Sequence, residues 1–190
     1  MNDGTNTRLE KMLLEESLNQ EFVSTLGQRV ERYLKLKPHA IIPNAHFATV
    51  SAECHFLYRD GHFYGTISLA QSVAEALVRF LCEKSGWKAA KEFEKNLKQL
   101  ETRKIVSTDL ASLFLEIWVD RDDYHHLNPK IEQDRQRLES LATNKLTALK
   151  KVEEELFAYT VNEGRLVPRY AKYWDQGQGE GTVSVFLRLE

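Results

Sequence analysis

Apolar residues of this 190-residue chain recur every three or four positions over long stretches, and its 9 glycines and 4 prolines mostly lie between those stretches. Such spacing places apolar side chains on one face of an α-helix, which turns once in about 3.6 residues. Glycine and proline interrupt helices, so they mark the connections. The pattern predicts an all-α fold, an antiparallel helical bundle with short connections.

The expected helices cover residues 8–36, 45–58, 62–84, 87–100, 110–126 and, beginning at Asn128-Pro129, 128–159. The helix over 62–84 has the clearest apolar stripe, formed by Phe63, Ile67, Ala70, Ala74, Leu77 and Leu81. Beyond Gly164 the chain becomes irregular. Alternating apolar residues over 182–189 predict a strand or extended tail, which needs an edge on this chain or another to pair with.

These elements divide the chain into three parts. We expect an N-terminal helical extension over residues 1–44, a helical bundle over 45–160, and a C-terminal irregular segment with an extended or β tail over 161–190. The role of the first and last parts does not follow from the pattern.

Composition limits the classes of function. The formal net charge is only −2, so a nucleic-acid surface would have to be a local patch. Cys54 and Cys82 are too few for a disulfide framework or a structural zinc site. Residues 1–8 are polar, unlike a signal peptide, and no apolar run approaches the roughly 20 residues that span a bilayer. We expect a soluble, cytoplasmic protein with no membrane partner.

The chemically richest segment is a run of six residues that ends just before Leu127-Asn128-Pro129. It contains a guanidinium, carboxylates, a phenol and two imidazoles: Arg121, Asp122, Asp123, Tyr124, His125 and His126. Arginine can hold a phosphate with a planar fork of donors, and histidine can move protons near neutral pH. The run is therefore suited to breaking a phosphodiester without a metal. The alternative interpretation is a polar helix end capped by its own side chains.

Spacing within the run constrains its geometry. Asp122 and His126 are four apart and share a face of a continuous helix, as do Arg121 and His125. Arg121 and His126 would diverge by roughly 140° on a regular helix. Aiming both at one phosphate requires the helix to loosen before Asn128, or a second copy to supply residues across a two-fold axis.

An arginine followed by a polar residue, with a histidine five positions from the arginine, resembles the signature of HEPN domains. These are helical modules of higher eukaryotes and prokaryotes, many of them metal-independent ribonucleases. Arg121, Asp122 and His126 match the signature, and residues 64–81 (YGTISLAQSVAEALVRFL) resemble the long apolar helix that opens the family's bundle. The resemblance covers roughly residues 45–159. Family toxins often carry a tyrosine two positions after the histidine, where this chain has Asn128.

The resemblance implies roles for the matched residues. Arg121 would bind the scissile phosphate, His126 would act as general base or acid at the ribose 2′-hydroxyl, and Asp122 would orient His126. The products would be a 2′,3′-cyclic phosphate and a 5′-hydroxyl, which requires RNA because DNA lacks the nucleophile. It also implies a homodimer, no cofactor, and a toxin or antiphage defence effector restrained by an antitoxin or regulatory protein.

Other residues are weaker candidates. Tyr124 and His125 could contact RNA, as could Arg165, Arg169 and Lys172, which alternate with aromatic residues; the alternative is that these aromatics pack on the bundle. Glu75 shares a polar helix face with Ser68, Ser72 and Arg79. Metal ligation by Cys54, His55 and His62, or by the adjacent histidines, is disfavoured, because zinc needs three or four converging ligands. We therefore expect no metal.

The sequence leaves two other functions open. The first is a non-catalytic HEPN-like module that binds nucleotides, RNA or a protein. The second is a scaffold subunit whose tail strand extends a partner's sheet.

Overall fold

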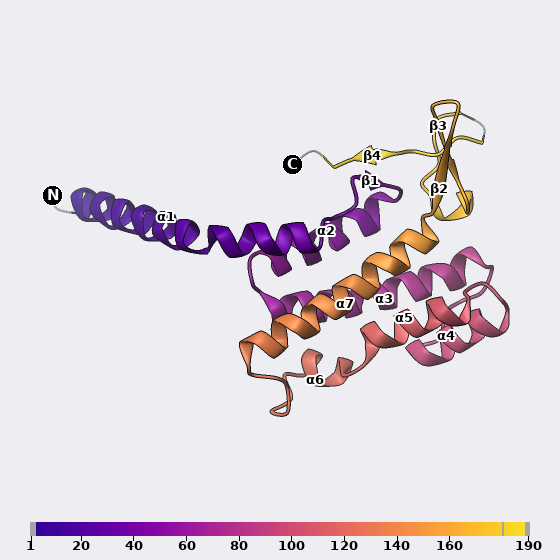
Figure 1. Ribbon diagram of the computed structural model, residues 1–190, viewed down its shortest axis with the longest axis horizontal. Coiled ribbons are helices and arrows are strands. Elements are labelled where there is room, and N and C mark those ends of the chain that lie inside the picture. The colour runs from indigo at the N-terminus through magenta and orange to yellow at the C-terminus, as the bar shows by residue number, and fades with distance from the viewer. Residues whose placement is uncertain (1–2, 180, 189–190) are drawn as a thin grey trace.

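A computed structural model describes residues 3–179 and 181–188, and it is mostly helical, as predicted (Figure 1). In chain order the α-helices are α1 (Asp3–Lys35), α2 (Ala45–Arg59), α3 (Phe63–Lys84), α4 (Phe93–Thr102), α5 (Thr108–Trp118), α6 (Arg121–His125) and α7 (Arg135–Leu156).

Helix α3 lies at the centre of the bundle, between α2 on one side and α5 and α7 on the other. The apolar stripe expected from its sequence is buried, and Ile67, Leu77 and Leu81 are fully inaccessible. Tyr58 of α2 and Thr143 of α7 join across the core through a 2.8 Å hydrogen bond between their hydroxyls. The prediction of a helical bundle is thus confirmed.

Helix α1 projects away from the bundle for most of its length (Figure 1). Only its last turns contact α2 and α7. There Arg32 is buried and forms a two-pronged pair with Glu139, with Nε to Oε1 at 2.9 Å and Nη2 to Oε2 at 3.3 Å. The neighbouring Leu36 is also buried, and its carbonyl accepts a hydrogen bond from Nδ1 of His55 at 3.0 Å.

Two short antiparallel strand pairs cover the other end of the bundle. Strand β1 (Ile41–Ile42) pairs with β4 (Phe186–Leu187), so the expected tail strand finds its edge on this chain. It is shorter than the predicted 182–189, and Leu189 lies outside the described residues. Strands β2 (Tyr159–Asn162) and β3 (Arg165–Pro168) form a hairpin that the sequence reading missed. A 3₁₀ turn, η1 (Ala171–Tyr173), follows the hairpin.

Two predicted helix starts are wrong, and side-chain hydrogen bonds explain both. Helix α4 begins at Phe93 instead of residue 87, because the Asn96 side chain bonds the N–H and carbonyl of Ala90 and holds the preceding segment as a loop. Helix α7 begins at Arg135 instead of residue 129. Asn128 accepts from the N–H of Lys130 within a turn, while Asp134 caps α7.

None of the helices in the described part of the chain is both long enough and apolar enough to cross a membrane.

Candidate functional site: the α6 segment and a second cavity

The predicted helix over 110–126 is broken in two, and the break positions the candidate catalytic residues. Helix α5 ends at Trp118, Val119 is extended, and Asp120 adopts the left-handed conformation with φ of 59°. Helix α6 then begins at Arg121 in a new direction beside α3. The break lies before Arg121, so Arg121 and His125 remain four residues apart on one helical segment, as the spacing predicts.

A buried lysine fixes this break. The Lys145 ammonium, on α7, donates to the carbonyls of Glu116, Ile117 and Val119 at 3.3, 2.9 and 2.7 Å. These carbonyls lack partners within their own helix because α5 stops there. Gln71 of α3, also buried, donates to the same Val119 carbonyl at 3.1 Å. Two helices thus hold the start of α6 in place.

Burial lowers the pKa of Lys145 to about 8, although the nearby carboxylates of Asp120 and Glu116 act in the opposite direction. Lys145 lies on a helix rich in charged residues, yet it is only 1% exposed. Its partners come from residues that are distant in the sequence, so local pattern gave no signal for its role.

Arg121 and His125 lie close together on α6. The Arg121 guanidinium carbon is 5.3 Å from the centre of the Trp118 ring, and Nη1 donates to Asp122 at 2.9 Å. Its Nε is buried and makes no hydrogen bond among the described residues, and the same holds for Nε2 of His125. Burial lowers the pKa of His125, and the Arg121 charge lowers it further. The imidazole is therefore neutral at pH values where an ordinary histidine is partly protonated.

The polar face of α3 borders this pair. Glu75 of α3 accepts from Arg79 at 2.7 Å, and its charge acts on His125 in the direction that raises the imidazole pKa. The Glu75 side of this face therefore lies within electrostatic reach of His125. We call Arg121, His125, His126 and Glu75 the α6 cluster.

His126 lies at the C-terminal end of α6. It is the exposed C-cap of α6, and its backbone N–H donates to the carbonyl of Asp122. The Asp122 carboxylate is exposed and pairs with Arg121, so the structure does not show it orienting His126. The Arg121 charge lowers the pKa of the His125 imidazole.

The expectation that Tyr124 contacts RNA is wrong, because its side chain is buried and cannot offer its ring to a base. The ring packs near Tyr64, with centroids 6.2 Å apart, and burial raises the pKa of its phenol.

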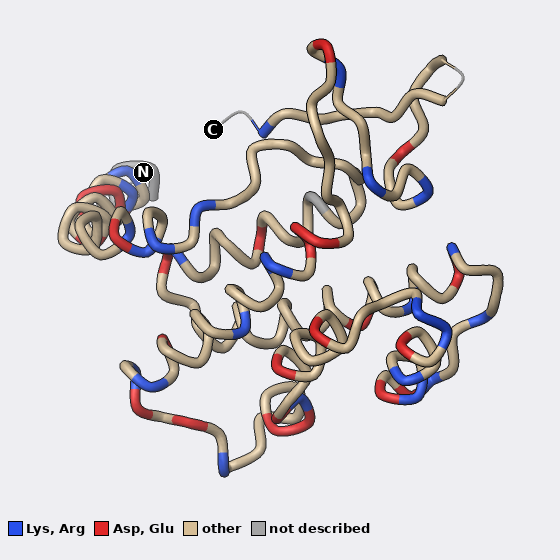
Figure 2. Tube along the Cα trace, turned by 45° about the vertical axis from the view of Figure 1, so that its right-hand side comes forward, with Lys and Arg blue, Asp and Glu red and all other residues tan. Residues whose placement is uncertain are grey.

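The other proposed RNA contacts do not gather with α6. Arg165, Arg169 and Lys172 lie on or just after the β2–β3 hairpin, at the end of the bundle away from α6 (Figure 1). Arg169 is 3.4 Å from a Glu155 oxygen. Basic and acidic residues are interspersed along the coloured part of the trace in Figure 2, so no single-sign face joins the two regions.

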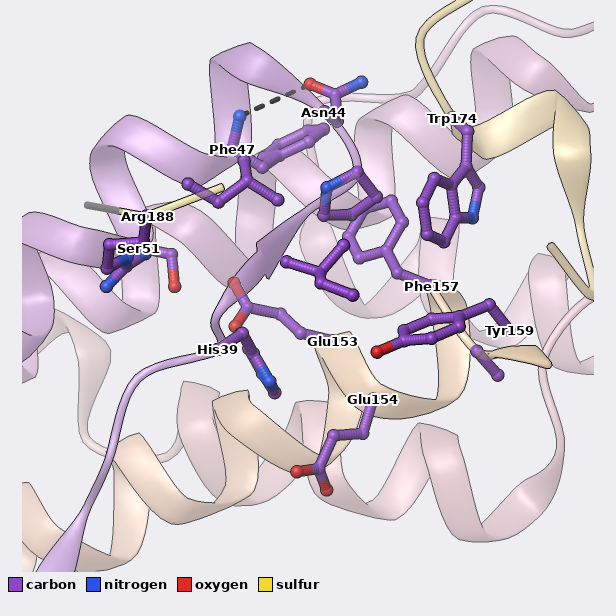
Figure 3. Close-up of a pocket in the computed structure, with 14 residues that line it drawn as sticks. His39, Asn44, Phe47, Ser51, Glu153, Glu154, Phe157, Tyr159, Trp174 and Arg188 are labelled. Carbon is purple, nitrogen blue, oxygen red and sulfur yellow. Dashed lines mark hydrogen bonds and ion pairs between the residues drawn. The ribbon is translucent and has the colours of Figure 1, made fainter. Parts of the chain in front are cut away.

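The structure reveals a second candidate that sequence analysis missed, a cavity of about 380 Å³ beside the C-terminal tail (Figure 3). We call it the tail cavity. The segment before α2, the end of α7 and the tail enclose it, and its lining includes His39, Asn44, Phe47, Glu153, Phe157, Tyr159, Trp174 and Arg188. Its residues are too far apart in the sequence for any motif to unite them.

Several buried polar atoms that line the tail cavity make no hydrogen bonds among the described residues. Glu153 is only 6% exposed, and one of its oxygens lies 3.4 Å from Nε2 of His39 without hydrogen-bonding geometry. The indole N–H of Trp174 and Nε of Arg188 are likewise unpartnered. Unpaired buried polar groups are costly, so this cavity is chemically suited to a ligand with both donors and acceptors.

Metal ligation finds no support in the described residues, where no group of three or more potential ligands comes together. Cys54 is buried, and burial raises the pKa of its thiol, as expected of a cysteine that serves as a small apolar residue.

Comparisons of this chain with known protein families, with curated proteins and with solved structures found no match.

Proposed function

We propose that this protein is a HEPN-like, metal-independent endoribonuclease that cleaves RNA at the α6 cluster. The observation that supports this most directly is the placement of Arg121 beside a neutral His125, with His126 exposed at the next position. The segment is anchored by Lys145 and Gln71, so these groups are held by the bundle instead of a free loop.

The chemistry assigns each group a role. Neutral His125 accepts the proton of the ribose 2′-hydroxyl, the 2′-oxygen attacks phosphorus, and the bond to the 5′-oxygen breaks. His126 donates the proton that the leaving 5′-oxygen needs. Arg121 stabilises the charge on the phosphate oxygens, helped by release of its contact with Asp122. A 2′,3′-cyclic phosphate and a 5′-hydroxyl result.

The biological setting is proposed from the resemblance alone. It is a homodimer in which two α6 segments face each other, acting in the cytoplasm as a toxin or antiphage defence effector. An antitoxin or regulatory protein would restrain it. Fold resemblance does not by itself specify function, so the chemistry must be tested first.

The test incubates the purified protein with RNA in EDTA and examines the fragment ends. We expect cyclic phosphates, a rate loss of about 10²- to 10⁴-fold in His125→Ala and in His126→Ala, and about 10²- to 10³-fold in Arg121→Ala. His46→Ala, an exposed histidine on α2, is the matched control and should cleave normally.

Cleavage that requires magnesium or zinc would contradict the mechanism, as would variants of all three residues that cleave like the wild type. If only His126→Ala loses activity, the family pattern describes the site and the assignment of His125 is wrong. Circular dichroism of each variant verifies that the helices remain.

The tail cavity favours a second candidate, a nucleotide-binding module without catalysis. Glu153 could accept an N–H from a base, the half-exposed Tyr159 ring could stack on it, and Arg188 could donate to a phosphate. Calorimetric titration with mononucleotides tests this. Binding that is lost in Glu153→Gln and retained in the surface control Glu163→Gln supports the module, whereas no binding by the wild type rejects it.

A further inference from the structure

Helix α1 leaves an extended apolar surface uncovered. Its large apolar side chains between residues 9 and 34 are 42% to 69% exposed: Leu9, Met12, Leu13, Leu14, Leu18, Phe22, Val23, Leu26, Val30 and Leu34. Single exposed apolar residues are common on proteins, but a contiguous strip of this length marks an interaction surface. The helix runs 33 residues, about 50 Å, and most of that length touches nothing in the bundle.

Five of the ten exposed apolar residues, Leu9, Met12, Val23, Leu26 and Val30, lie on one heptad line of α1. Steps of three and four alternate without interruption through one line of positions: Leu9, Met12, Glu16, Asn19, Val23, Leu26, Val30 and Tyr33. Apolar residues repeated in this way over at least three heptads form the seam of a coiled coil. The two polar positions, Glu16 and Asn19, interrupt the seam near its middle. The other five exposed apolar residues lie outside this line: Leu13, Leu14, Leu18, Phe22 and Leu34.

Charge is divided unequally along the helix. Residues 8–21 carry Glu10, Glu15, Glu16 and Glu21 against Arg8 and Lys11, whereas residues 22–35 carry Arg29 and Lys35 against Glu31, with Arg32 buried and paired with Glu139. A parallel partner of the same sequence would place the acidic halves together and face Glu16 with itself. An antiparallel partner would place each acidic half against a basic half.

We propose that α1 pairs with α1 of a second copy of this chain as an antiparallel coiled coil. Its layers would be Leu9 with Tyr33, Met12 with Val30, Glu16 with Leu26, and Asn19 with Val23, each repeated by symmetry. Glu15 of one copy would then lie near Arg29 of the other, a residue that already reaches Asp60 at 3.5 Å within its own chain. Symmetric pairing of this kind closes on itself and gives a dimer.

This contact is separate from the α6 apposition in the proposed function. Antiparallel pairing holds the two bundles at opposite ends of the paired helices, so it leaves each α6 segment with its own copy. The pairing does not depend on RNA cleavage, and the two proposals can fail independently.

Sedimentation of the full chain over a range of concentrations tests the pairing. We expect a species of twice the 22.0 kDa chain mass, and a dissociation constant raised roughly 100-fold or more in Leu26→Glu/Val30→Glu. Glutamate favours helix, so α1 itself should persist by circular dichroism. Leu115→Glu, exposed on α5, is the matched control and should dimerise like the wild type.

Cross-linking tests the orientation. Met12→Cys mixed with Val30→Cys should form a mixed disulfide under mild oxidation, whereas Met12→Cys alone should not cross-link to itself. Self-cross-linking of Met12→Cys would show a parallel pair and overturn the proposal. A wild type that stays monomeric up to about 1 mM would also overturn it, as would a dimer unaffected by the double substitution.

Discussion

Helices α1 and α3 share one kind of sequence pattern and have opposite surroundings. Both carry apolar residues at helical spacing, yet the stripe of α3 is buried in the core, whereas that of α1 is exposed along nearly its whole length. The bundle closes around α3 without α1. Periodicity therefore identifies an apolar helix face, but it does not identify what covers that face.

The largest difference in unfolding free energy should come from shortening one leucine to alanine in each of the two helices. Leu77→Ala opens a cavity in a fully buried part of α3 and should cost about 2–5 kcal/mol of unfolding free energy. Leu26→Ala, on the exposed face of α1, should cost less than about 0.5 kcal/mol in the dilute monomer. Urea unfolding measures both values. Equal costs would mean that α1 is part of the cooperative core.

The next effect concerns the junction where the two regions meet. Arg32→Ala removes the two-pronged pair with Glu139 and the guanidinium that lies 5.1 Å from the Phe63 ring. We expect a loss of about 1–3 kcal/mol. Arg8→Ala on the projecting part of α1 is the control and should change little. If the two variants are equally stable, the junction contributes nothing to the fold.

The stability of the fold should depend on pH through a histidine at the same junction. Burial lowers the pKa of His55 from 6.5 to about 4, so the folded imidazole stays neutral while the unfolded one is protonated below about pH 6.5. Stability should therefore fall as pH decreases from 6.5 to 4, by about 1–3 kcal/mol relative to His55→Asn. The asparagine amide can still donate to the Leu36 carbonyl. Parallel pH profiles of the two proteins would contradict this.

The smallest effect should be a gain in stability. Gly27 lies inside α1 with ordinary helical φ, and an added Cβ would meet nothing within 4 Å. Gly27→Ala should stabilise the helix by about 0.5–1 kcal/mol. Thermal unfolding followed by circular dichroism at 222 nm would detect it. A destabilised variant would indicate that another chain packs closely against this position.

The helices with a clear apolar periodicity could be predicted from the sequence. The expected bounds of α2 and α3 agree with the structure within one residue, because Asn44 caps α2 locally and Ser85-Gly86 follows the end of α3. The β2–β3 hairpin was missed, although Asn162-Glu163-Gly164 separates two short runs suited to strands. The last expected helix overlaps β2 only at Tyr159, and the rest of the hairpin falls where no regular element was expected.

The α6 cluster was predicted only in part. The segment itself was identified from its residue types, and these can be read from the sequence without any long-range information. The break after Trp118, which sets where α6 begins, depends on Lys145 and Gln71. These residues reach the Val119 carbonyl from other helices, so local spacing could not reveal the geometry.

The buried Lys145 ammonium makes the α5–α6 turn observable by chemical labelling. While its three carbonyl partners hold it, an amine-reactive reagent cannot reach the nitrogen, although every exposed lysine reacts at once. Burial lowers its pKa to about 8, and when the turn opens the amine is solvated and reacts like the exposed lysines. The rate of Lys145 modification, read by peptide mass spectrometry, would therefore report how often that turn opens.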